Sequence, residues 1–82
     1  MANQTEYYVD IQKLSFKMSE KCLNIRQLSQ KAGISVTTIY NIFKGWKPSG
    51  TTITGVATAL DLTFQELNDI FFAQEITPHV NF

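Results

Sequence analysis

Residues 31–45 read KAGISVTTIYNIFKG. This stretch contains a sharp corner at Gly33, from which the interpretation of the rest of the chain can start. Two helical patterns meet there, since glycine readily adopts the left-handed conformation that often follows a helix. Ser35 is a favourable N-cap for the second pattern, which Gly45 ends. The sequence therefore predicts two short helices with a tight connection. That connection is either an ordinary corner or a means of presenting the second helix to a partner.

Helical spacing of apolar residues continues on both sides of this corner. Two capping boxes add to it, one formed by Asn24 with Gln27 and one by Thr63 with Glu66. We expect five helices, at residues 7–21, 24–32, 35–44, 52–60 and 63–72. The predicted fold class is all-α, a compact bundle of about five short helices around one core.

The apolar positions of each predicted helix indicate the core. Ile34, which lies in the corner between the two helices, is expected to pack into the core. Cys22 is expected to continue the apolar face of the first helix. Phe16 points away from that face and is left unexplained. The expected inward side chains are Tyr7, Ile11, Leu14, Met18, Leu28, Ala32, Ile39, Ile42, Phe43, Ile53, Val56, Ala57, Leu60, Phe64, Leu67 and Phe71.

Length and composition exclude several classes of protein. The chain has 82 residues, 44% of them apolar, which suits one small core. No apolar run approaches the roughly 18 residues of a membrane span, and residues 1–10 do not resemble a signal peptide. Cys22, the single cysteine, indicates a reducing cytoplasm. We expect no metal, no cofactor and no catalytic site, because the sequence offers no ligand cluster and no nucleophile–base pair.

The charges are unevenly distributed although the net charge is zero. All seven basic residues lie between Lys13 and Lys47, and Glu20 is the only acid in residues 11–60. The remaining six acids lie near the two ends of the chain. A basic middle segment favours an anionic partner such as nucleic acid, while the plain alternative is a set of solvated lysines.

Residues 23–67, LNIRQLSQKAGISVTTIYNIFKGWKPSGTTITGVATALDLTFQEL, resemble the Xre-type helix-turn-helix family, the phage repressor and Cro group. The resemblance rests on Leu28, the corner Ala32–Gly33–Ile34–Ser35, the buried pair Ile39 and Ile42, and the loop at Gly45, Pro48 and Ser49. It implies a lambda-repressor-like fold. It also implies a homodimer that binds double-stranded DNA sequence-specifically, as a transcriptional repressor.

The resemblance also suggests a domain organisation and a set of contacts. A helix-turn-helix domain is expected at residues 1–72, with the motif at about 24–44, followed by a C-terminal tail at 73–82. The second helix of the motif would enter the major groove. The expected base contacts are Val36, Thr37, Thr38, Tyr40, Asn41 and Lys44, and the expected phosphate contacts are Arg26, Lys47, Ser49 and Thr51.

Other interpretations stay open at this point. Val36 and Tyr40 could cover the core, Thr38 could bond within its own helix, and Asn41 could simply be solvated. The expected dimer surface consists of the apolar residues Phe72, Ile76, Val80 and Phe82.

Two positions depart from the family pattern. Ile25 stands where the family often has glutamine, and Phe43 stands where many members carry glutamate. Together with the zero net charge and the apolar surplus, they favour an alternative function: an antirepressor-like module that binds another regulatory protein.

Overall fold

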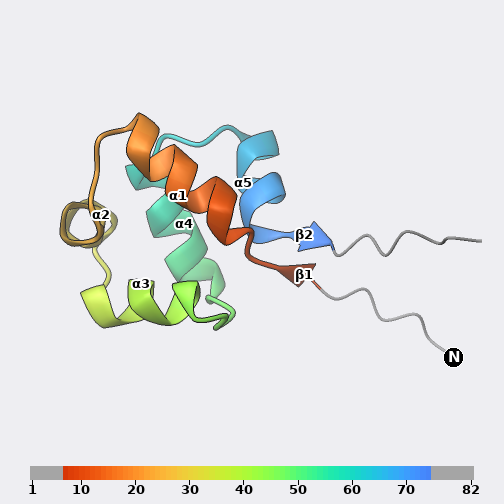
Figure 1. Ribbon diagram of the computed structural model, residues 1–82, viewed down its shortest axis with the longest axis horizontal. Helices are drawn as coiled ribbons and strands as arrows, with labels where there is room; N and C mark the ends of the chain where they lie inside the picture. Colours follow the sequence, from red (N-terminus) through yellow and green to blue (C-terminus); the bar gives the residue numbers. More distant parts are fainter. Residues whose placement is uncertain (1–6, 75–82) are drawn as a thin grey trace, which may run out of the picture.

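The fold places five helices in succession over residues 7–74, the part of the chain that the computed structural model describes (Figure 1). A short strand precedes the helices and another follows them. The elements are β1 (Tyr7–Tyr8), α1 (Ile11–Glu20), α2 (Ile25–Ala32), α3 (Val36–Phe43), α4 (Gly50–Ala59), α5 (Phe64–Phe71) and β2 (Ala73–Gln74). The predicted all-α bundle is confirmed. None of these helices is long and apolar enough to cross a bilayer.

Each helix begins at a side chain that caps it. The cap oxygen accepts the backbone N–H three residues further on, which satisfies a donor that the helix itself leaves unpaired. Both predicted capping boxes, Asn24 with Gln27 and Thr63 with Glu66, are confirmed. The five caps are Asp10, Asn24, Ser35, Ser49 and Thr63. Because a cap involves residues close in sequence, the helix starts follow from local chemistry.

The first helix starts later than predicted, so the expectation for Tyr7 was wrong. Tyr7 and Tyr8 form a strand that pairs antiparallel with Ala73 and Gln74. The Asp10 N–H donates to the Ile70 carbonyl at 2.7 Å, which ties the entrance of α1 to α5. Aromatic residues suit such a half-exposed pleated pair. The helix therefore begins only after Asp10 has turned the chain.

The core lies where all five helices meet. Six side chains are almost completely buried: Leu14, Leu28, Ile39, Ile42, Val56 and Leu60. Ile34 packs against this cluster from the corner, as predicted, and α2 lies against α4. Gly55 allows that approach, since a Cβ atom there would lie 2.7 Å from the Ala32 carbonyl oxygen.

Besides Tyr7, two more residues that were predicted to lie in the core are exposed. Phe64 is 80% exposed at the start of α5, whereas Ile70 and Phe71 near the end of that helix are buried. Cys22 is exposed in the turn after α1, where its φ of 57° takes it out of the helical repeat. In both cases the helix end moves the side chain off the inward face.

The expected dimer residues are only partly described. Phe72 is 40% exposed, and its ring meets that of Tyr7 edge to face with the centroids 5.7 Å apart. Ile76, Val80 and Phe82 lie outside the described residues. The pairing of β2 with β1 takes the fold past residue 72 to Gln74, and the division into a domain at 1–72 and a tail at 73–82 stays a prediction.

Candidate nucleic-acid interface

The corner between α2 and α3 has the predicted geometry. Gly33 adopts the left-handed conformation, with φ 71° and ψ 29°, and its N–H donates to the Ser29 carbonyl. Ser35, in an extended conformation, then caps α3 through a 3.0 Å hydrogen bond from the Thr38 N–H. The chain thus leaves one helix and enters the next within three residues.

The helix α3 is held by one face and open on another. Ile39 and Ile42 are buried in the core. Among the predicted base contacts, Thr37, Tyr40 and Lys44 are exposed, and the other three, Val36, Thr38 and Asn41, are partly buried. Tyr40 is 50% exposed, so it does not serve only as a cover for the core. A polar face of α3 is therefore available to a partner.

Thr38 differs from the other predicted base contacts because its hydroxyl group is already hydrogen-bonded within the protein. Its Oγ1 lies 2.8 Å from the Ser35 Oγ, within the cap of α3. The structure therefore shows the alternative interpretation of Thr38, in which its side chain forms a hydrogen bond at the end of its own helix. A base contact by Thr38 would have to share this hydroxyl with Ser35.

The predicted phosphate contacts lie on the surface around α3. Arg26 belongs to the first turn of α2, and Lys47 and Ser49 to the loop after α3; Thr51 lies in the first turn of α4, and all four are exposed. The Ser49 Oγ accepts the Thr52 N–H at 3.4 Å to cap α4. The side chains of Arg26, Lys47 and Thr51 make no such cap and are open to solvent.

A groove beside α3 brings together residues that sequence reasoning had treated separately. Ile25, Arg26, Tyr40 and Phe43 line one groove of about 610 Å³. Both departures from the family pattern thus share a site with a predicted base contact and a predicted phosphate contact. Helical spacing could not reveal this meeting, because it depends on the angle between α2 and α3.

The basic residues near α3 have no acidic residue close to them in the sequence. Residues 21–60, from the end of α1 to the end of α4, contain five basic residues and no acid. Within residues 7–74, ion pairs join Lys17 to Glu20 at 3.0 Å and to Glu66 at 2.6 Å, and none involves Arg26, Lys44 or Lys47. The basic charge near α3 is therefore uncompensated by ion pairs in this part of the chain.

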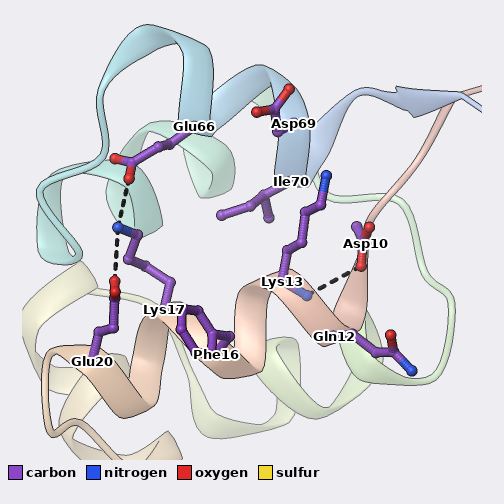
Figure 2. Close-up of a pocket in the computed structure, with 9 residues that line it drawn as sticks. All are labelled: Asp10, Gln12, Lys13, Phe16, Lys17, Glu20, Glu66, Asp69 and Ile70. Atoms are coloured by element: carbon purple, nitrogen blue, oxygen red, sulfur yellow. Dashed lines mark hydrogen bonds and ion pairs between the residues drawn. The ribbon is translucent and has the colours of Figure 1, made fainter.

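Four acidic residues lie together with two lysines around a groove between α1 and α5: Asp10, Glu20, Glu66 and Asp69 with Lys13 and Lys17. Figure 2 shows Lys17 between Glu20 and Glu66, beside a groove that Phe16 and Ile70 also line. The hydrogen bonds that Lys17 donates to Glu66 and Glu20 raise the pKa of Lys17, and the bond from Lys17 lowers the pKa of Glu66. This ion-pair cluster connects the first and last helices at a place apart from the polar face of α3.

Comparison with known protein families defines the class of protein. A corner-joined helix pair, a capped and outward-facing second helix and uncompensated basic side chains are features of a helix-turn-helix DNA-binding domain. The chain belongs to the Cro/C1-type helix-turn-helix DNA-binding domain family, whose model matches residues 13–72. No curated protein and no solved structure matches the chain. The resemblance seen in the sequence is thereby confirmed at the level of the family.

Proposed function

We propose that this protein is a sequence-specific regulator of transcription that binds double-stranded DNA and acts as a repressor in the cytoplasm. One observation carries the proposal: Ile39 and Ile42 anchor α3 in the core while Thr37, Tyr40 and Lys44 stay exposed. An α-helix held in this manner fits the major groove of B-DNA, where base pairs differ in their donors and acceptors.

The proposed base contacts follow from side-chain chemistry. Asn41 would pair with the major-groove edge of adenine, and Val36 would contact a thymine methyl group. Lys44 would bind guanine or a phosphate, while Thr37 and Tyr40 contribute hydroxyl groups. Since α3 contains no arginine, we expect half-sites that lean towards A·T pairs.

The phosphate contacts would hold the domain in register. Arg26 and Lys47 supply charge, and Ser49 and Thr51 lie at the start of α4, where free N–H groups favour an anion. Such contacts raise the affinity for any duplex and carry no sequence information.

We further propose that the protein binds as a homodimer. A two-fold dimer matches a palindromic operator when its two α3 helices lie about 34 Å apart, one turn of DNA. Phe72, which is exposed beside Tyr7, is the described part of the predicted dimer surface. Occupation of such an operator would block access of other proteins to the same DNA.

In vitro selection of bound duplexes from a random pool tests this function directly. We expect a palindromic motif with its half-sites one turn apart. Affinity should fall with salt by about 0.9 log unit per contacted phosphate for each log unit of salt. Selection without enrichment, together with no binding to random duplex at low salt, would contradict the proposal.

The groove beside α3 favours a second candidate function, a module that binds another regulatory protein. Ile25 and Phe43 give this groove apolar walls at the edge of the polar face, where polar side chains would suit DNA better. The same salt experiment separates the two functions. A module that acts only on proteins should show almost no mobility shift with random duplex DNA at low salt.

A further inference from the structure

Ser29 holds the corner of the helix-turn-helix through both its side chain and its backbone. Its hydroxyl group donates to the Ile34 carbonyl, although the two residues lie on opposite sides of Gly33. Its own carbonyl accepts the Gly33 N–H at 2.9 Å and the Ile34 N–H at 3.2 Å. Both backbone polar groups of Ile34 are therefore bonded to one residue of α2.

The position of Ile34 makes these bonds important for α3. Ile34 is the single residue between Gly33, which ends α2, and Ser35, which caps α3. Its side chain packs against the core, while its carbonyl group directly precedes the cap residue. A change at the Ile34 carbonyl would therefore reorient Ser35 and the first turn of α3.

We propose that Ser29 is a positioning residue for DNA recognition: its hydroxyl group sets the angle at which α3 leaves the corner. This inference rests on the proposed function, because Thr37 and Asn41 meet their base edges only at one orientation of α3. Without the hydroxyl group, the Ile34 carbonyl loses its partner and the corner adopts several orientations. Specific binding must then select one of them, which weakens the affinity.

Non-specific binding responds differently to the same change. It depends on phosphate contacts from side chains such as Arg26 and Lys47, which tolerate a small rotation of α3. The ratio of specific to non-specific affinity therefore reports positioning, whereas a role in stability alone leaves this ratio unchanged as long as the protein is folded.

The test compares three variants on a selected duplex and on random duplex, at one salt concentration and at a temperature where circular dichroism shows all of them folded. Ser29→Ala should weaken specific binding about tenfold and random binding by less than about twofold, as expected for one lost hydrogen bond. Thr58→Ala, which removes a hydroxyl group from an exposed position near the end of α4, should leave both affinities unchanged. Ser29→Thr, which keeps the hydroxyl group, should bind the selected duplex with an affinity within about threefold of the wild type.

Amide hydrogen exchange of the free protein gives a readout that needs no DNA. Ser29→Ala should speed exchange at Gly33 and Ile34 about tenfold and leave the core amide of Leu60 unchanged. An unchanged affinity ratio with unchanged exchange at the corner would overturn the role of Ser29. If the wild type binds no duplex, the proposed function fails instead, and the exchange rates alone decide whether Ser29 holds the corner.

Discussion

Asn41 and Lys47 represent the two kinds of contact that a DNA-binding surface needs. Asn41 is a partly buried residue of α3, and its amide carries a donor and an acceptor in fixed relation. Lys47 is exposed in the following loop and offers a point charge on a flexible stem. The first suits recognition of one base, and the second suits attraction to any phosphate.

Replacement of each residue by alanine should separate these roles. Asn41→Ala should relax the preference at one base position, at a cost of about 1–3 kcal/mol for the preferred sequence. Lys47→Ala should weaken binding to all sequences alike and lower the slope of log affinity against log salt by about one. Titrations of the selected duplex, its single-base variants and random duplex measure both effects. A uniform loss for Asn41→Ala would show that this residue does not read a base.

At the scale of the elements, the contact between α2 and α4 determines how the helix-turn-helix packs against the rest of the bundle. Gly55 lies in the middle of α4, close against the last residue of α2. A Cβ atom at this position would clash with the Ala32 carbonyl oxygen. Because that oxygen belongs to the backbone, it cannot move away as the end of a flexible side chain could. This glycine is therefore needed for close packing, despite its low helix propensity.

Gly55→Ala should consequently destabilise the protein by about 1–3 kcal/mol, because α4 must move away from α2. Gly50→Ala is the matched control at the first position of the same helix. A Cβ there meets nothing within 4 Å, so stability should stay equal or rise by up to about 0.5 kcal/mol. Urea unfolding of both variants measures the difference. Equal free energies of unfolding for the two variants would mean that α4 can move away from α2 without a loss of stability.

At the scale of the whole molecule, Lys17 connects the two ends of the folded chain. It pairs with Glu66, which also accepts the Thr63 N–H in the capping box of α5. The pKa of Glu66 is lowered from about 4.5, so the pair stabilises the fold fully above that pH and the contribution is lost as the pH falls further. The pKa of Lys17 is raised above 10.5, so on the alkaline side stabilisation is lost only as the pH rises beyond that value.

Glu66→Gln should isolate this contribution. Glutamine preserves the capping box but carries no charge to pair with Lys17. We expect the variant to be less stable than the wild type at pH 7, and the difference to shrink as the pH falls from about 5 to 3. Urea midpoints measured across this range check the result. A difference independent of pH would show that the carboxylate charge contributes nothing.

Sequence reasoning succeeded where interactions are local. The caps at Asn24, Ser35 and Thr63 and the left-handed Gly33 all depend on residues within a few positions, so their residue types predict them. It failed at Tyr7, whose strand partner is Gln74, and at Phe64, which lies exposed at the start of α5. Those outcomes depend on where distant parts of the chain come together.

The sequence alone determined the class of fold, the corner at Gly33 and the residue types carried by α3. Only the tertiary structure decided that Ser29 holds Ile34, that Ile25 and Phe43 share a groove with Tyr40, and that Lys17 pairs with Glu66. The physical reason is the range of the interactions. Caps and turns form between neighbours, whereas a groove or an ion pair between helices depends on crossing angles that the packed core sets.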